Sequence, residues 1–238
     1  MKWGRYNFYG QRNAMFLQGE KLPSFLDNGF GLLWKATREE KTGKYAGLLA
    51  GVFARTVAYS QSFRDLQMIS GAMAAKYPLG GCNYCNALPC SCSSGRRSAT
   101  THDNKSSSGN PQLLWTISQC VEHVRHMYGK INQGKCIYFA CLRLNEEIGE
   151  VKNAHLFDGY WDNKVYLGTR RWSIALEFAD VFAWIFSIAD IIEVDLEKEI
   201  RDRYGGVCKR CEKRPCKCNS PEMYENRSRT VETRLSGS

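Results

Sequence analysis

Five carboxylates lie at helical spacing within two apolar stretches of this chain. They are Glu146, Glu147, Glu150, Glu177 and Asp180. Side chains three or four positions apart share one face of a helix, so the first three form one acidic ridge and the last two form another. Two such ridges facing each other would repel strongly unless a cation lay between them. Hard oxygen ligands suit Mg²⁺ or Mn²⁺, and these ions suit a phosphorylated substrate.

A solvated helix face is the alternative, because that is the common role of glutamates at this spacing. Around Glu177 and Asp180, however, the residues from Ile174 to Phe186 are almost all apolar. Little polar surface is left for the two acids to share, which indicates a functional site. The sequence contains no G-x-x-x-x-G-K-[ST] phosphate loop. A P-loop ATPase or kinase is therefore not supported.

The order E-E-x-x-E, a spacer and E-x-x-D resembles the MazG-like all-α nucleotide pyrophosphohydrolases. The resemblance covers about residues 113–218, and the stretch ADIIEVDLEKEIRDRY looks like the continuation into the family's last helix. The dCTP pyrophosphatase-type branch is the most similar. Asp190 stands where that branch carries an Ala-Asp pair, and residues 194–196 stand where it carries Ile-Asp-Leu.

The resemblance implies an enzyme that hydrolyses a (deoxy)nucleoside triphosphate to the monophosphate and pyrophosphate with Mg²⁺ or Mn²⁺. The implied metal ligands are Glu147, Glu150, Glu177 and Asp180. Glu146 would support the site or activate the attacking water. Trp184 replaces a tyrosine that lines the base pocket in this branch, so an aromatic stacking surface is kept.

Further substrate contacts are expected between and before the two acidic stretches. The implied residues are Phe157 and Trp161 for the base, Arg170 and Arg171 for phosphate, and His123. Residues 157–172 are predicted to form a loop, because they contain two glycines and several aromatic residues, and the resemblance implies that this loop lies near the substrate. Core packing is the alternative for either aromatic, and a core or surface position is the alternative for His123 and the nearby His126.

Two cysteine motifs with the same spacing, C-x2-C-x4-C-x-C, use eight of the eleven cysteines. The first cysteine knot is Cys82, Cys85, Cys90 and Cys92, and the second is Cys208, Cys211, Cys216 and Cys218. Four thiolates within so short a span match a closed structural Zn²⁺ site. The remaining cysteines, Cys120, Cys136 and Cys141, lie in apolar helical sequence and are expected in the core.

Two alternatives to zinc stay open for the knots. Disulfides are one, although the start of the chain has no apolar run that resembles a signal peptide, which favours a reducing compartment. An iron–sulfur cluster is the other, because it also uses four thiolates and the spacing does not distinguish the two.

The knots also indicate an internal repeat. Each follows a Lys-Tyr or Arg-Tyr pair, and each has a Val-Phe-Ala sequence upstream, at residues 52–54 and 181–183. When the two Val-Phe-Ala sequences are aligned, Glu177 corresponds to Leu48 and Asp180 to Gly51. The first copy therefore lacks the counterparts of these two metal ligands.

Further upstream, Glu39 and Glu40 are candidate counterparts of Glu146 and Glu147, but Gly43 stands at the position that corresponds to Glu150. We predict a degenerate copy that keeps the fold and loses the site. The alternative is that residues 24–77 form an unrelated helical region.

The chain is predicted to be an all-α, MazG-like tandem pseudo-repeat with two small cysteine knots. Its segments are a degenerate half at 1–92, a flexible linker at 93–112, an active half at 113–218 and a mobile tail at 219–238. Helices are predicted at 113–129, 136–156, 173–193 and 195–204. The resemblance implies an intrachain pseudo-dimer or a homo-oligomer.

The net charge of +9 suits a nucleotide substrate, because anions favour a positive surface. A zinc-knot module that binds RNA or DNA is the main alternative, since the second knot is rich in Lys and Arg, although the first has no basic residue within it. A nucleotide-sensing or interaction subunit with little turnover is a third. We expect no membrane partner and a soluble, cytoplasmic protein, because no apolar stretch reaches the length of an uncharged span.

Overall fold

The structure is a computed structural model, and it describes residues 21–61, 66–78, 81–82, 85, 87–92, 116–160, 167–205 and 212. Four of the predicted features lie outside these residues: the linker, the tail, Trp161 and the second cysteine knot.

The described part of the chain is helical and contains no strand, which confirms the all-α prediction for these residues. Its elements are α2 (Lys21–Arg38), the 3₁₀ turn η2 (Thr42–Lys44), α3 (Tyr45–Gln61), α4 (Leu66–Lys76), α5 (Ile117–Asn132), α6 (Ile137–Tyr160), α7 (Leu167–Ile191) and α8 (Leu196–Tyr204). Among these helices, none combines the length and the apolar character that crossing a bilayer requires.

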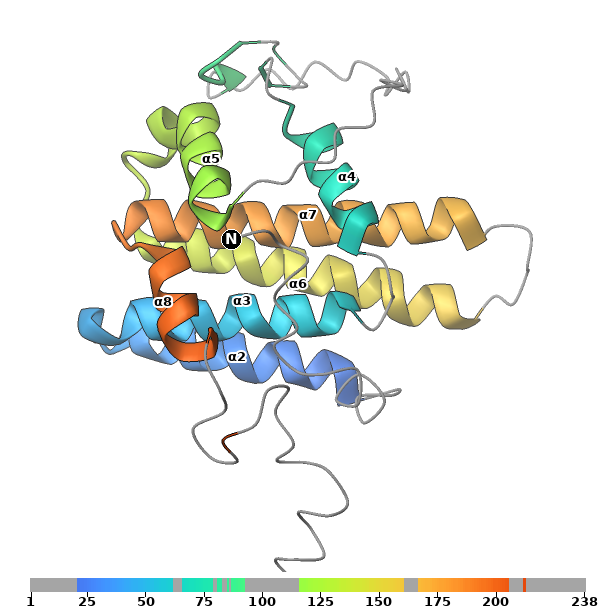
Figure 1. Cartoon of the computed structure of the whole chain (residues 1–238), viewed down its shortest axis with the longest axis horizontal. Helices are drawn as coiled ribbons and strands as arrows, with labels where there is room; N and C mark the ends of the chain where they lie inside the picture. Colours follow the sequence, from blue (N-terminus) through green and yellow to red (C-terminus); the bar gives the residue numbers. More distant parts are fainter. Residues whose placement is uncertain are drawn as a thin grey trace, which may run out of the picture.

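Four long helices form the body of the molecule. In Figure 1, α7, α6, α3 and α2 lie side by side with their axes roughly aligned. Helix α6 packs on α7, α2 packs on α3, and the two pairs meet through α3 and α7 and through α2 and α6. The three remaining helices cover this bundle: α4 and α5 pack on α7, and α8 packs on α3.

Local sequence signals explain where the covering helices begin. Thr116 caps α5 with a capping box, in which Thr116 Oγ1 accepts from the Gln119 N–H at 3.1 Å and Gln119 Oε1 accepts from the Thr116 N–H at 2.8 Å. Asp195 caps α8 by accepting from the Lys198 N–H at 2.9 Å. Glu197 then links α8 to α5, because it accepts hydrogen bonds from the Ser118 N–H and hydroxyl.

The predicted loop at residues 157–172 is wrong at both ends. Helix α6 continues to Tyr160 and α7 begins at Leu167, so Phe157, Arg170 and Arg171 belong to helices. Glycine and aromatic residues disfavour a helix only weakly, and the packing of two long antiparallel helices outweighs that preference. The other predicted boundaries in this half agree to within a few residues, apart from the start of α7.

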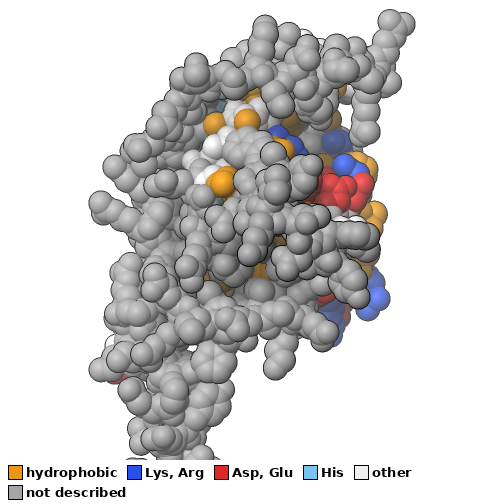
Figure 2. Space-filling model, turned by 90° about the vertical axis from the view of Figure 1, so that its right-hand side faces the viewer, with side chains coloured by type: hydrophobic (Ala, Val, Ile, Leu, Met, Phe, Trp, Pro, Cys, Tyr) orange, Lys and Arg blue, Asp and Glu red, His pale blue; other side chains and the backbone are white. Residues whose placement is uncertain are grey.

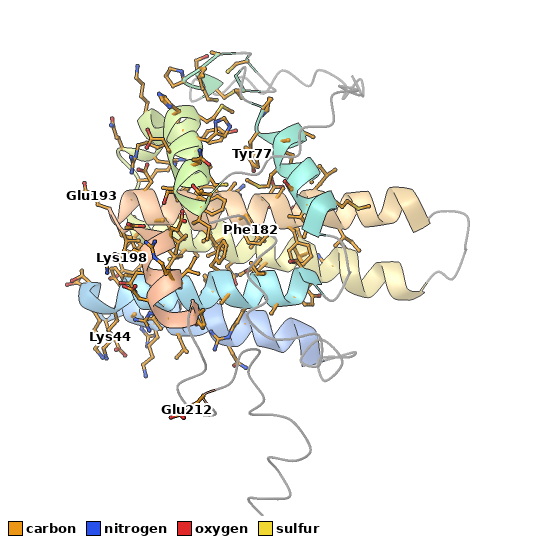
Figure 3. The ribbon with its side chains drawn as sticks, viewed as in Figure 1. Lys44, Tyr77, Phe182, Glu193, Lys198 and Glu212 are labelled. Atoms are coloured by element: carbon orange, nitrogen blue, oxygen red, sulfur yellow. The ribbon has the colours of Figure 1, made fainter. Side chains whose placement is uncertain are left out.

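Both halves of the chain contribute to one apolar core. Phe53 of α3 packs edge-on against Phe182 of α7 with ring centroids 5.5 Å apart, and Tyr59 packs on Phe178 at 5.4 Å. Phe182 lies in the middle of the bundle in Figure 3 and is fully buried.

The position of Phe182 gives a test of the fold. We expect Phe182→Ala to lower the free energy of unfolding by about 3–5 kcal/mol, because it leaves a cavity between α3 and α7. Urea unfolding measures this value. The matched control is Leu142→Ala on α6, whose residue is 55% exposed and whose loss should change stability by less than about 0.5 kcal/mol. Similar losses in the two variants would contradict this packing.

Candidate metal centre

Helices α6 and α7 bring the two acidic ridges together. Carboxylate oxygens of Glu147, Glu150 and Glu177 all lie within 4.8 Å of one another, and we call these residues the carboxylate trio. The buried residues Leu144, Ile148 and Val151 fix α6 in this register, and Phe178 and Val181 do the same for α7. The helical spacing thus places three of the four predicted ligands in one cluster.

Burial and mutual repulsion shape the electrostatics of the trio. Glu147 is only 7% exposed, and burial together with Asp180 and Glu150 raises its pKa to about 7, although Arg143 acts in the opposite direction. Burial also raises the pKa of Glu177, while the nearby Lys76 lowers it. Both pKa values are raised because the negative form is disfavoured here, and a bound cation would relieve that cost.

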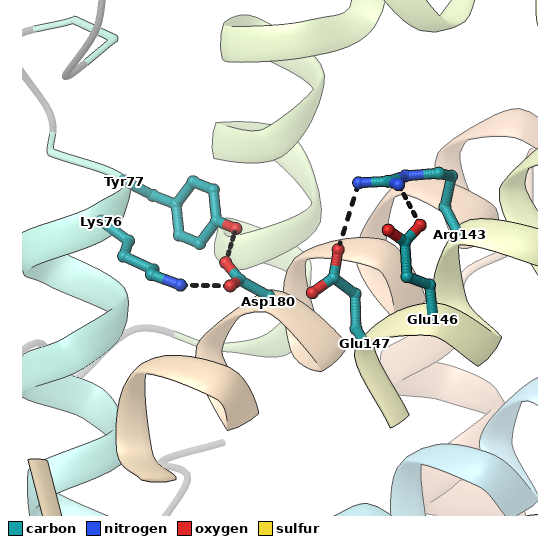
Figure 4. A network of polar contacts seen from close by, with 6 residues as sticks. All are labelled: Lys76, Tyr77, Arg143, Glu146, Glu147 and Asp180. Carbon is teal, nitrogen blue, oxygen red and sulfur yellow. Dashed lines mark hydrogen bonds and ion pairs between the residues drawn. The ribbon is translucent and has the colours of Figure 1, made fainter. Parts of the chain in front are cut away.

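Asp180 lies beside the trio but bonds to the first half of the chain. Its Oδ2 forms an ion pair with the Lys76 ammonium, and its Oδ1 accepts from the Tyr77 hydroxyl at 2.6 Å (Figure 4). Burial and the charge of Asp180 raise the pKa of Tyr77 well above its usual value, so the phenol stays protonated and can donate. A lysine cation thus partly neutralises the acidic centre.

Glu146 is not a member of the trio and is held by Arg143. The two form an ion pair one helical turn apart, and the side chain of Glu146 is 50% exposed. Arg143 also reaches Glu147, with Nη2 3.4 Å from Oε1 (Figure 4). Glu146 is accordingly an accessible carboxylate next to the trio.

Trp184 lies in a cluster of aromatic rings and cations. It packs edge-on against Phe139 at 6.2 Å. The Lys135 ammonium lies 5.6 Å from its ring centre and the Arg143 guanidinium 5.8 Å, both within the range of cation–π attraction. Because Arg143 contacts Glu146, Glu147 and this ring, the aromatic surface adjoins the acidic centre.

A cavity of about 830 Å³ lies between α5 and the turn that joins α7 to α8. Arg125, Asn132, Lys135 and Asp190 are among the residues that line it. None of its lining residues belongs to the trio, but Lys135 also contacts the Trp184 ring. The cavity has the size of a small-molecule site, and Lys135 connects it to the aromatic surface.

His123 contacts the backbone of Tyr77. Its Nε2 lies 2.9 Å from the Tyr77 carbonyl oxygen, so this nitrogen is the donor, and burial lowers the pKa of the ring. The histidine therefore fixes the backbone of Tyr77. The side chains of Phe157, Arg170 and Arg171, like Trp161, lie outside the described residues.

Four residues of this region were not predicted from the sequence: Lys76, Tyr77, Lys135 and Arg143. Arg143 carries a usable signal, because it precedes Glu146 and Glu147 by three and four positions and so shares their helix face. Lys76 and Tyr77 were noticed only as the pair that precedes the first cysteine knot. Nothing in their local sequence indicates a partner more than a hundred residues away.

The first cysteine knot gathers four sulfur atoms within 4.8 Å of one another, a spacing compatible with a metal site. Cys82 Sγ lies 3.7 Å from Cys92 Sγ, and Cys85 Sγ lies 3.8 Å from Cys90 Sγ. Four thiolates each about 2.3 Å from zinc are about 3.8 Å apart, so these spacings fit Zn²⁺. All four cysteines are free thiols, and the hydrogen bond that Ser91 donates to Cys85 helps to lower the pKa of that thiol to about 6.

Lysine and arginine side chains in the described residues are largely engaged with acids. Lys152 pairs with Asp27, Lys198 with Asp202, and Arg203 with Glu199. On the face drawn in Figure 2, the coloured acidic side chains gather in a patch beside Lys and Arg side chains. Among the described side chains drawn on that face, no continuous stripe of basic side chains is visible of the kind that a nucleic-acid surface needs.

Comparison of the chain with protein-family models, with curated proteins and with solved structures finds no match. The centre therefore has to be interpreted from its own geometry and chemistry.

The raised pKa of Glu147 predicts how stability depends on pH. Between about pH 5 and pH 7 the folded chain keeps a proton that the unfolded chain releases, so the free energy of unfolding should fall as the pH rises through this window. A shift from 4.5 to about 7 corresponds to a loss on the order of 3 kcal/mol. Urea unfolding at pH 5 and pH 8, with a chelator of divalent cations present, measures this loss.

The control for this prediction is Glu147→Gln, which cannot titrate. His123, with its lowered pKa, acts in the opposite direction below pH 6.5, so the difference between wild type and Glu147→Gln isolates the glutamate. A difference that does not change between pH 5 and pH 8 would show that Glu147 titrates normally.

Proposed function

We propose that this chain is a divalent-cation-dependent nucleotide pyrophosphohydrolase of the MazG-like kind, which cleaves a (deoxy)nucleoside triphosphate to the monophosphate and pyrophosphate. The observation that carries the proposal is the carboxylate trio, in which the buried Glu147 lies within 4.8 Å of the half-buried Glu177 and the exposed Glu150. Crowding a buried carboxylate against two further acids is costly unless a cation compensates the charge.

The donor set fits a hard cation. Its oxygens come from Glu147, Glu150 and Glu177, with Asp180 as the fourth ligand once Lys76 moves aside. Carboxylate oxygens suit Mg²⁺ or Mn²⁺ and disfavour soft metals. When bound, such an ion neutralises phosphate charge and acidifies water.

The remaining roles fall to side chains around the trio. We assign Glu146 to accept the proton of the attacking water, because it is accessible and adjoins Glu147 through Arg143. Arg143 and Lys76 supply positive charge for phosphate oxygens. Trp184 and Phe139 offer a stacking surface for the base, with Lys135 between that surface and the neighbouring cavity.

The tandem pseudo-repeat is part of this proposal, and three packing details support it. Phe53 and Phe182, which the repeat register equates, pack on each other. The last described helix of each half covers the other half, since α4 packs on α7 and α8 packs on α3. A side chain added at Gly51, the counterpart of Asp180, would meet the Tyr204 hydroxyl, as Asp180 meets the Tyr77 hydroxyl.

In the proposed degenerate half, arginine side chains would fill the place of a lost acidic site. Arg203, the counterpart of Lys76, lies where a side chain at Gly47 would be, and Arg55 lies against Gly29 and Gly51. Glu39 and Glu40 lie in the turn after α2 and not on its buried face, so they are poor counterparts of Glu146 and Glu147. Arginine side chains occupy the space that acids and a cation would share.

A nucleotide-binding protein with little turnover is a second candidate. One observation favours it: both oxygens of Asp180 are already bonded, one to a lysine that a catalytic cation would have to displace.

Product analysis separates the two candidates. The purified chain is incubated with a panel of nucleoside triphosphates and Mg²⁺, and the products are identified by chromatography. We expect a monophosphate and pyrophosphate from at least one substrate, with no reaction in excess chelator. Binding without any product would support the second candidate, and release of inorganic phosphate with a diphosphate would contradict the proposed reaction.

A further inference from the structure

The first cysteine knot lies next to the residues that neutralise Asp180. Only residues 78–81 separate Tyr77 from Cys82 along the chain. In Figure 3 the labelled Tyr77 lies between the end of α4 and α5, and the backbone runs from there into the knot. Movement of the knot relative to the bundle would therefore move Lys76 and Tyr77.

Helix α5 joins the knot to Tyr77 through direct contacts. The Cys90 N–H donates to the Met127 carbonyl oxygen at 2.8 Å, and Met127 packs with Cys82 and Cys90 in a small buried cluster. One residue on, Tyr128 packs edge-on against the Tyr77 ring at 6.0 Å. One turn before, His123 donates to the Tyr77 carbonyl oxygen. The knot and the Tyr77 backbone are thus fixed to the same two turns of α5.

Four thiols do not hold such a cluster together by themselves, because an S–H group is a weak donor. A bound Zn²⁺ would cross-link residues 82–92 and fix the chain end that follows α4. Without the metal, the last turn of α4 keeps its packing on α7 but loses this anchor on its C-terminal side.

We propose that Zn²⁺ in the first cysteine knot positions Lys76 on Asp180, so that occupancy of the knot sets the affinity of the carboxylate centre for divalent cations. The inference rests on the proposed cation site but not on turnover. Lys76 and a divalent cation compete for Asp180. An anchored lysine is harder to displace than a mobile one, so zinc in the knot weakens cation binding at the trio.

Because the coupling is thermodynamic, it can be measured as a change in cation affinity at the trio or as a change in zinc affinity at the knot. If zinc lowers the affinity of the centre for a cation by some factor, the cation lowers the affinity of the knot for zinc by the same factor. Lys76 is a positioning residue in this scheme, and its removal uncouples the two sites.

Isothermal titration with Mn²⁺ tests the coupling. The zinc-free form is the Cys85→Ala/Cys92→Ala double variant, which removes the two half-buried ligands and keeps the buried Cys82 and Cys90. We expect it to bind Mn²⁺ about 5- to 10-fold more tightly than zinc-loaded wild type, at the low end of typical couplings. Lys76→Met should show a gain of similar size, and adding it to the double variant should give little more. Cys136→Ala, an exposed cysteine outside the knot, should bind as wild type does.

Two outcomes overturn the inference while leaving the cation site intact. They are equal Mn²⁺ affinity in the double variant and wild type, and a full further gain when the double variant is combined with Lys76→Met. Failure of every form to bind Mn²⁺ would remove the cation site itself and with it the proposed function.

A second measurement uses the folded, zinc-loaded protein and does not depend on the cysteine variants. Zinc transfer to a zinc-selective chromophoric chelator is measured with and without saturating Mg²⁺. We expect Mg²⁺ to raise the equilibrium release of zinc severalfold, and to have no effect in Lys76→Met. Unchanged or reduced release in wild type overturns the inference.

Discussion

Glu147→Gln is expected to lower the hydrolysis of a nucleoside triphosphate more than about 100-fold, because loss of a group that merely supports a metal ligand already costs 10- to 100-fold. The same change should stabilise the cation-free protein at pH 8 by up to about 3 kcal/mol. The reason is that it removes a buried carboxylate whose pKa is raised to about 7. Product chromatography measures the first effect, and urea unfolding in chelator measures the second.

Loss of activity combined with a gain in stability distinguishes a cation site from a structural glutamate. Glu40→Gln is the matched control, since Glu40 is exposed in the turn that follows α2 and should affect neither quantity. Turnover at the wild-type rate in Glu147→Gln would remove this residue from the centre. Loss of activity together with loss of stability would instead indicate that the glutamate supports the fold.

Cys82→Ser and Cys90→Ser should each remove one equivalent of zinc per chain and lower the free energy of unfolding by several kcal/mol. Both thiols are buried, and zinc bound at a structural site contributes roughly 10–16 kcal/mol in small peptides. Metal analysis of protein purified without added zinc and urea unfolding measure the two effects.

Cys136→Ser is the control for the knot, because Cys136 lies outside the cluster and is exposed, contrary to the core position expected from the sequence. A visible absorption band in the wild-type protein would instead indicate an iron–sulfur cluster. Metal-free protein without reactive thiols in the knot would establish disulfides and rule out zinc there.

Helical periodicity was sufficient to predict the four helices of the second half, α5 to α8, because each helix buries one face and the apolar residues repeat accordingly. The spacing placed Glu147 and Glu150 on one helix face and Glu177 on another, and the resemblance to the MazG-like family implied that they share a site. The loop at 157–172 was wrong, since the sequence there is ambiguous and the packing of α6 on α7 decides it. The residue pattern within one helix does not indicate which other helix it packs against.

The partners of Asp180 could not be predicted for the same reason. Lys76 and Tyr77 are local residues at the end of α4, and only the fold brings them to α7. His123 was expected near the substrate, yet it bonds the Tyr77 carbonyl oxygen. Contacts between the two halves of the chain decide both cases.

Crystals grown with Mn²⁺ and a non-hydrolysable α,β-imido nucleoside triphosphate would test the central claim most directly, because the anomalous signal of Mn²⁺ locates the ion. We expect the ion between the carboxylates of Glu147, Glu150 and Glu177, in contact with phosphate oxygens, with Lys76 moved off Asp180 and the base beside Trp184. Nucleotide bound elsewhere, or Mn²⁺ absent from the carboxylate trio at saturating concentration, would contradict it.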